Sequence, residues 1–302
     1  MPTAGAFRQG DTAEMNTGSS PTASSARVGE LPGAAQLRRE TPPPSRALQL
    51  LELRAFGEFG STLALLPLLR RAPRGDGHPV LVLPGLLAGD ASTRPLRTFL
   101  ADHGYDVHGW GLGRNLGFKP GLEDRMKACL QGLHRKSGRR VSLVGWSLGG
   151  VFAREMARRA PEQVRGVITL GSPFAGVPRA SNAWRLYEQA SQRKVEDWPA
   201  RERMKTPPPV PATAIFSRSD GIVAWQGCLE REGPGAENIE IEGSHCGLGH
   251  NPAALYAIAD RLAQPEGQWK PFDRSGLRGL VYPDPRRSEK AAPGLAGWAA
   301  GQ

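Results

Sequence analysis

Short runs of branched apolar residues recur through the middle of the chain and indicate strands buried on both faces. They lie at residues 79–83, 141–144, 164–170 and 212–217. Residues 105–110 and 238–242 predict two more strands, the second with polar and apolar residues in alternation. Continuous apolar strands are typical of a parallel sheet that helices cover on both sides.

Apolar residues spaced three or four positions apart predict helices between these strands. The helices lie at about residues 94–103, 122–136, 151–160 and 253–263, and the third is stopped by Pro161. Strands and helices therefore alternate along the chain. We expect an α/β fold with a mostly parallel central sheet flanked by helices.

The two ends of the chain differ from this pattern. Residues 1–45 are rich in Ser, Thr, Gly, Ala and Pro, and they bury too little to offset their ordering entropy, so we expect a disordered leader. Residues 265–302 are rich in Pro, Gly and Arg, which predicts an irregular C-terminal tail. One domain, residues 46–264, lies between them.

Residues 46–77 predict an N-terminal helical segment. Its apolar residues step by three or four, as on one face of a helix: Leu48, Leu51, Ala55, Phe59, Leu63 and Leu66. Charged residues interrupt the run, so a membrane span is not expected. Two interpretations stay open: a helix docked on the flank of the domain, or an interfacial helix, because Arg70 and Arg71 follow the apolar run 63–69.

The candidate chemistry centres on Gly-Trp-Ser-Leu-Gly at residues 145–149, between a predicted strand and a predicted helix. A serine on so sharp a turn needs neighbours without side chains, and Gly145 and Gly149 meet that need. Ser147 is therefore a candidate nucleophile. The alternative is a glycine-rich turn with an incidental serine.

An activated serine also requires a base and a carboxylate, in the chain order Ser, Asp, His. Asp220 follows the strand at 212–217 and His245 follows the strand at 238–242, so the order is satisfied. His250 competes with His245 as the base. We choose His245 because it lies nearer the strand end, whereas His250 leads into a helix.

These three motifs resemble the α/β-hydrolase superfamily: residues 145–150, Ser-Asp-Gly-Ile-Val at 219–223 and Gly-Ser-His at 243–245. They are most similar to bacterial lipases and esterases, including relatives of the inositol deacylase that acts on glycosylphosphatidylinositol. The resemblance covers about residues 78–264. It implies a Ser147–Asp220–His245 triad, and the Gly-Ser-His context supports the choice of His245.

The resemblance also implies an oxyanion hole and a cap. In lipase relatives a His-Gly-x stretch after the first strand supplies one N–H; here Pro84 replaces the histidine, and the N–H groups of Leu86 and Leu148 are the candidate donors. Strand–helix alternation pauses at residues 174–211, where superfamily members often place a cap. The alternative for this insert is a surface helical hairpin without a gating role.

Composition narrows the class of protein. The 302 residues carry a formal net charge of +10, which favours anionic partners such as a phospholipid surface. No nucleic-acid-binding motif appears, so we expect no nucleic acid, and peripheral contact with an anionic membrane stays open. Three cysteines, Cys129, Cys228 and Cys246, do not form a disulfide scaffold, and no signal peptide is visible, so a cytoplasmic location is expected.

The sequence thus predicts a serine hydrolase that cleaves carboxylic esters of small molecules or lipids through an acyl-enzyme. No metal-binding spacing is present and no cofactor is expected. Two alternatives remain: an acyltransferase or amidase with the same triad, and a non-catalytic binding protein on a hydrolase fold.

Overall fold

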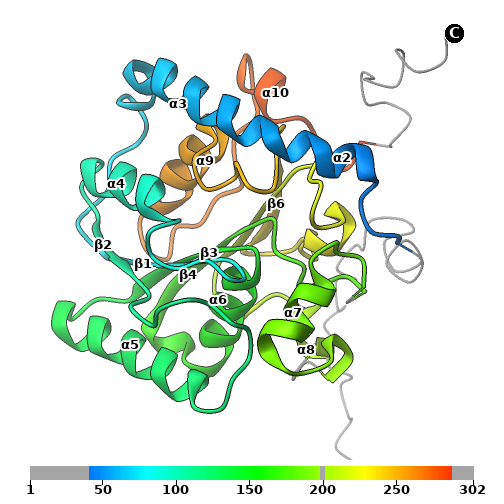
Figure 1. The fold of residues 1–302 in the computed structure, drawn as a ribbon. Coiled ribbons are helices and arrows are strands. Elements are labelled where there is room, and N and C mark those ends of the chain that lie inside the picture. The colour runs from blue at the N-terminus through cyan, green and yellow to red at the C-terminus, as the bar shows by residue number, and fades with distance from the viewer. Residues whose placement is uncertain (1–40, 178, 198–200, 288–302) are drawn as a thin grey trace, which may run out of the picture.

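The computed structural model describes residues 41–177, 179–197 and 201–287. Residues 1–40 of the predicted leader and 288–302 of the predicted tail lie outside this range. A single six-stranded sheet forms the centre, in the order β2-β1-β3-β4-β5-β6, and every adjacent pair is parallel (Figure 1). The strands are β1 (Pro79–Leu83), β2 (Asp106–Gly109), β3 (Val141–Trp146), β4 (Val164–Leu170), β5 (Ala212–Phe216) and β6 (Ala236–Glu240).

Burial on both sheet faces explains why β1 is apolar at every position. In β1, Leu81 and Leu83 enter one core, while Val80 and Val82 enter the other. Successive side chains of a strand point to opposite faces, so a strand covered on both sides has no position for an exposed polar residue. The predicted α/β fold with a parallel sheet is confirmed.

Helices fill both sides of the sheet. Side chains of α5 (Leu122–Ser137) and α6 (Leu148–Arg159) belong to the first core, and those of α4 (Arg94–Asp102) and α9 (Pro252–Leu262) belong to the second. In Figure 1, α5 lies below the sheet and α9 above it. This layering leaves the carboxyl ends of the strands uncovered by the sandwich helices.

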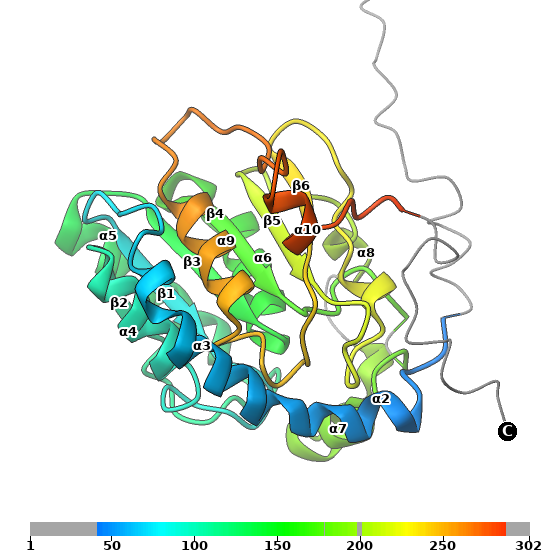
Figure 2. The same cartoon turned by 90° about the horizontal axis from the view of Figure 1, so that it is seen from above.

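The N-terminal helical arm, residues 46–69, runs almost unbroken through α2 (Arg46–Leu50), η1 (Leu51–Arg54) and α3 (Ala55–Leu69). Figures 1 and 2 show its α3 part beside α9. The expected apolar stripe is not the docked face: Leu51, Phe59 and Leu63 are exposed. The face that meets the domain instead carries polar groups that bind loop N–H groups, as described below.

The remaining elements lie at the margins of the sandwich. The insert at 174–211 contains α7 (Trp184–Ser191), η3 (Val195–Asp197) and α8 (Arg201–Met204), and single turns η2 (Pro161–Gln163) and η4 (Trp225–Cys228) join other elements. The tail up to residue 287 includes α10 (Arg278–Val281). Phe272 and Tyr282 of the tail are buried in the second core, while Leu277 is exposed.

Candidate active site

The predicted site residues gather at the carboxyl edge of the sheet. Leu86 follows β1, Ser147 follows β3, Asp220 follows β5 and His245 follows β6. Because all strands are parallel, their carboxyl ends meet at one edge, which is where open α/β sheets hold ligands. The four residues therefore share this edge: Asp220 and His245 are in direct contact, whereas no hydrogen bond joins Ser147 Oγ to His245 in the described part of the chain.

Ser147 occupies a strained turn between β3 and α6. Its φ of 52° and ψ of −122° lie in a region that side-chain-bearing residues rarely adopt. A Cβ on Gly145 would lie 2.3 Å from the Gly150 Cα, and one on Gly149 would lie 2.3 Å from the Leu83 carbonyl oxygen. Only glycine fits at both positions, as the elbow pattern predicts.

Asp220 and His245 form a buried hydrogen-bonded pair. The distance between His245 Nδ1 and Asp220 Oδ2 is 2.6 Å, so the ring N–H donates to the carboxylate. The other oxygen, Asp220 Oδ1, accepts the backbone N–H groups of Ile222 at 2.8 Å and Val223 at 2.7 Å. These bonds fix the carboxylate and leave Nε2 as the ring nitrogen that is free to act as a base.

The charge balance around His245 favours its protonated form. Burial lowers the pKa of His245, but the charge of Asp220, the hydrogen bond to it and the charge of Glu52 outweigh burial, so the pKa is raised above its ordinary value. The loop is also held to the elbow, because Trp146 Nε1 donates to the His245 carbonyl at 3.1 Å.

Both candidate oxyanion donors border the same pocket as Ser147. Leu86 and Leu148 line it, and no hydrogen bond joins the N–H of either to another residue that the structure describes. Gly85 brings the loop against the elbow, since a Cβ there would lie 3.3 Å from Ser147 Cβ. Two N–H groups without partners beside a serine are suited to a developing oxyanion.

Asn115, which the sequence did not single out, holds the Leu86 loop in place. Its side-chain amide donates to the Pro84 carbonyl at 2.8 Å, and its backbone carbonyl accepts the Leu87 N–H at 2.7 Å. Asn115 is fully buried. The glycine-rich loop 111–117 thus holds the loop after β1 in place through Asn115. Nothing in the spacing of its glycines predicted a role for this asparagine.

Glu52 of the N-terminal helical arm binds the loops that carry Asp220 and His245, and the sequence did not single it out. Its Oε1 accepts the N–H of Gly221 at 2.7 Å and of His245 at 2.9 Å, and its Oε2 accepts the N–H of Cys246 at 2.8 Å. Burial raises the pKa of Glu52, but these three hydrogen bonds and the charge of His245 lower it more, so the net direction is down. The only signal in the sequence was a carboxylate that interrupted an apolar run.

Two further side chains of the arm also form hydrogen bonds with the backbone of these loops. Glu58 Oε1 accepts the Ser244 N–H at 2.7 Å, and Arg54 Nη2 donates to the Ser219 carbonyl at 2.8 Å. Residue 219 precedes Asp220 and residue 244 precedes His245. The arm therefore holds the loop on each side of the Asp–His pair.

His250, the competing base, and two nearby nucleophile-type side chains lie in other settings. His250 Nε2 donates to the Ala55 carbonyl at 3.0 Å, so this ring is engaged by the arm. Ser172 is fully buried and packs against Gly150. Burial and the charge of Glu52 raise the pKa of the Cys246 thiol to about 12, which keeps it protonated at neutral pH.

The insert covers the serine side of the site. Ser181, Ala183, Trp184, Tyr187 and Val195 line the pocket that contains Ser147. Most of these side chains are apolar, as is usual for a pocket that binds an acyl or alcohol group.

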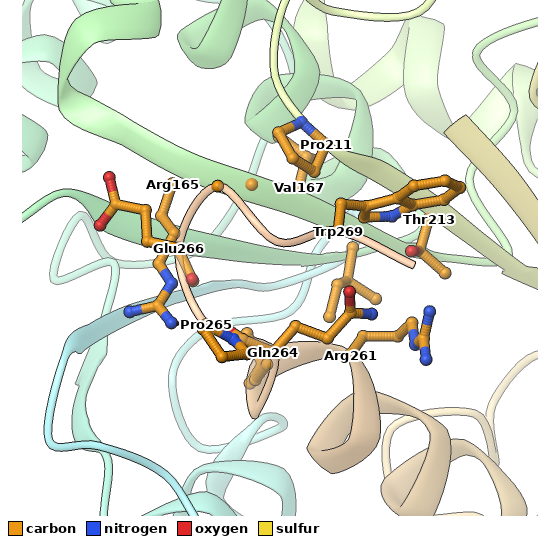
Figure 3. A pocket seen from close by; sticks show the side chains of 14 residues that line it. Arg165, Val167, Pro211, Thr213, Arg261, Gln264, Pro265, Glu266 and Trp269 are labelled. Atoms are coloured by element: carbon orange, nitrogen blue, oxygen red, sulfur yellow. Dashed lines mark hydrogen bonds between the residues drawn. The ribbon is translucent and has the colours of Figure 1, made fainter. Parts of the chain in front are cut away.

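A second pocket lies at the opposite edge of the sheet, near the amino ends of β3, β4 and β5 (Figure 3). Its charged side chains are paired: Arg165 binds Asp76 at 3.0 Å, and Arg261 binds Glu237 at 2.8 Å. Trp269 of the tail lines it as well. This pocket is where the tail closes against the sheet, remote from Ser147.

Within the described ranges, no group of three or more His, Cys, Asp or Glu side chains is placed to hold a metal ion. In the same part of the chain, no helix combines the length and apolar character that crossing a membrane requires.

Comparison with known proteins finds partial similarity to proteins named as esterases and to a thioesterase family model. The family model described as palmitoyl protein thioesterase matches residues 79–207, a span that includes Leu86 and Ser147 and ends before Asp220. Pimeloyl-[acyl-carrier protein] methyl ester esterase of Shewanella woodyi is 31% identical over 113 residues, which is 36% of this chain and 42% of that protein. The protein of the same name from Shewanella sp. (strain MR-7) is 30% identical over 127 residues, covering 41% of this chain and 46% of the relative. The matched region thus spans less than half the length of these curated relatives.

Solved structures with similar folds include Aspergillus fumigatus lipase B, at 18% identity and a TM-score of 0.49, covering 64% of this chain and 54% of that chain. An α/β superfamily hydrolase from Oenococcus oeni PSU-1 has 18% identity and a TM-score of 0.46, covering 62% of this chain and 91% of that chain.

Proposed function

We propose that this chain is a serine hydrolase of the α/β-hydrolase superfamily that cleaves carboxylic esters and thioesters. The observation that carries the proposal is the strained Ser147 at the sheet edge where Asp220 fixes His245. A strained serine and an oriented histidine at one edge have no evident packing role, whereas acyl transfer requires both.

In the proposed mechanism, Ser147 Oγ attacks the acyl carbon and its proton passes to His245 Nε2. Asp220 holds the ring through Nδ1 and stabilises the imidazolium. The N–H groups of Leu86 and Leu148 bind the oxyanion; removing one such donor costs about 3–4 kcal/mol in a well-studied protease. The leaving alkoxide or thiolate takes the proton from Nε2, and water then releases the acyl group by the same steps.

The pocket chemistry supports an apolar acyl or alcohol group. Leu86, Trp184, Tyr187, Val195 and Val223 surround the serine. Relatives named as methyl ester esterases and a family model named for a thioesterase support extending the substrate class from oxygen esters to thioesters. We also propose that the insert at 174–211 acts as the cap over the bound acyl chain.

The alternative activities share this machinery. An acyltransferase or amidase would use the same triad with another acceptor or leaving group, and a binding protein would have no activated serine. A cytoplasmic location and the absence of nucleic-acid partners stay predictions from the sequence.

A fluorophosphonate probe separates an activated serine from a binding protein. Wild-type protein should be labelled, whereas Ser147→Ala, with an unchanged melting temperature, should not. Hydrolysis of p-nitrophenyl esters from C2 to C16 and of matched acyl thioesters then measures the substrate class. Labelling that survives in Ser147→Ala, or ester hydrolysis within tenfold of wild type in that variant, would refute the proposal.

A further inference from the structure

The N-terminal helical arm, residues 46–69, has an inner face bound to the domain and an outer face that nothing in the described structure covers. The inner face carries Glu52, Arg54 and Glu58, whose bonds to the triad loops are given above, and Thr62, whose hydroxyl donates to the His250 carbonyl. These contacts fix the orientation of the arm. The opposite side chains must therefore point to solvent.

The outer face is strongly apolar. Nine of the fourteen exposed large hydrophobic residues in the described part of the chain belong to this arm. The most exposed are Phe56 at 80%, Leu50 at 72% and Leu53 at 69%. Isolated exposed apolar residues are ordinary, but a contiguous strip of them on one helix marks a surface that binds something. The nine are Leu50, Leu51, Leu53, Phe56, Phe59, Leu63, Leu65, Leu66 and Leu68.

The charged residues of the arm indicate what kind of partner would bind this face. Both carboxylates of the arm, Glu52 and Glu58, are turned inward and bonded, whereas Arg46 at its start and Arg70 and Arg71 just after its end are exposed. The exposed side chains of the arm and of the two residues after it therefore include many apolar groups and three arginines but no carboxylate. That combination is typical of a helix lying in the plane of an anionic lipid surface.

A groove next to α3 also combines apolar side chains with arginines. It has a volume of about 780 Å³ and lies between α3 and α4. Leu63 and Leu66 line its apolar part, and Arg70, Arg74 and Arg94 lie along it. One carboxylate, that of Asp102, also borders the groove.

We propose that the outer face of the N-terminal helical arm docks on a bilayer that contains anionic lipids. A second copy of the chain suits the face less well. In an antiparallel two-fold contact, Arg46 of one copy would face Arg70 and Arg71 of the other, and no exposed carboxylate of the arm would balance them. Docking itself is independent of ester hydrolysis. If the proposed function also holds, docking brings the loops of Asp220 and His245 close to the lipid surface.

Vesicle binding tests the proposal directly. Co-sedimentation of the full chain is measured with phosphatidylcholine vesicles and with mixed phosphatidylcholine–phosphatidylglycerol vesicles. We expect binding to the mixed vesicles that weakens with added salt. The variant Leu53→Asn/Phe56→Asn should weaken that binding by at least about tenfold, because it removes two apolar side chains that would be buried in the lipid.

A matched control removes equally exposed apolar side chains elsewhere. Leu277→Asn/Leu280→Asn on the tail alters two residues that are each 82% exposed and should bind vesicles as wild type does. Melting temperatures of both variants should be unchanged, since the altered side chains make few native contacts. Absence of wild-type binding to anionic vesicles, or equal losses in the two variants, would overturn the proposal. A wild-type dimer in light scattering that Leu53→Asn/Phe56→Asn converts to monomer would instead identify the face as a contact between copies.

Discussion

The carboxylate of Glu52 accepts the backbone N–H of His245 at 2.9 Å, and the same oxygen accepts the N–H of Gly221 at 2.7 Å. One side chain of the N-terminal helical arm thus joins the loop that carries the proposed base to the loop that carries its carboxylate partner. The negative charge of Glu52 also raises the pKa of His245. Glu52 therefore acts on the Asp–His pair through both position and charge, without reaching the serine.

Glu52→Ala should lower kcat by about tenfold or more while Ser147 remains in place. The change leaves three loop N–H groups without their acceptor, at a cost of about 1–3 kcal/mol for each that stays buried. A loosened base loses alignment with the nucleophile. Steady-state kinetics on one ester, with circular dichroism of the fold, measure the effect.

A pH profile distinguishes this positioning role from general destabilisation. Glu52→Gln removes the charge, so the apparent pKa of kcat/KM should fall relative to wild type. A structural defect alone would lower the rate without moving that pKa. An unchanged profile together with an unchanged kcat would show that the arm does not support the site.

Wild-type activity should rise with pH through an apparent pKa above the ordinary value of about 6.5, because the base must be unprotonated and the pKa of His245 is raised. The same shift predicts a stability effect of known sign. His245 binds its proton more tightly in the folded state, so its contribution to stability is full below the unfolded pKa and is lost as pH rises through the folded pKa. Rate and melting temperature measured across pH 5 to 9 on the same samples test both signs.

Asp220→Asn should reduce kcat by a large factor, about 10⁴-fold in a serine protease where the equivalent change has been made. It removes the charge and replaces the oxygen that accepts Nδ1–H by an NH2 group, since the remaining oxygen is retained by the Ile222 and Val223 N–H groups, and the apparent pKa should fall. Combined with His245→Ala, the loss should be far smaller than the product of the two single losses, because the residues act as one unit. Multiplicative losses would contradict the proposed pair.

His245→Ala should abolish ester hydrolysis, whereas His250→Ala should retain most of it. His250 donates to the Ala55 carbonyl and stacks edge-on against Phe59 at 5.5 Å, so its loss affects the docking of the arm more than the chemistry. Turnover of both variants on the same ester decides the assignment. Retained activity in His245→Ala together with an inactive His250→Ala would make His250 the base.

The fold could be predicted where local pattern and global burial agree. Residues 79–83 are apolar at every position because both faces of β1 are covered, and that pattern is visible in the sequence. The arm shows the opposite case. The apolar stripe left a docked and an interfacial helix open, and Leu51, Phe59 and Leu63 are exposed. The docked face is decided by Glu52 and Glu58, whose carboxylates accept N–H groups of loops almost 200 residues away. The spacing of apolar residues along the sequence does not indicate which distant backbone N–H groups need an acceptor.

The candidate site likewise contains residues that the sequence predicted and residues that it did not. Ser147, Asp220 and His245 could be chosen because each follows a predicted strand and parallel strands end together, although their catalytic roles stay predictions. Asn115 and Glu52 could not be chosen, since an asparagine in a glycine-rich loop and a carboxylate in a helix have many ordinary functions. Their partners appear only when the loops are placed in space.

Arg154 of α6 leads to a prediction about stability. It is buried, forms an ion pair with the buried Glu230, and donates to the carbonyls of Met204 at 2.9 Å and Thr206 at 2.8 Å. Its guanidinium also lies 3.7 Å from the centre of the Phe174 ring. These contacts anchor the end of the insert to the core beneath it.

Arg154→Leu should lower the free energy of unfolding by about 3–5 kcal/mol, because the carboxylate of Glu230 stays buried without its partner. Arg154→Leu/Glu230→Leu should recover part of that loss, since replacing both charges removes the unpaired group. Full recovery is not expected, because the Met204 and Thr206 carbonyls still lose their donor. Urea unfolding of the two variants and wild type measures the differences. A double variant no more stable than Arg154→Leu would mean that the carbonyl contacts, rather than the ion pair, hold the insert.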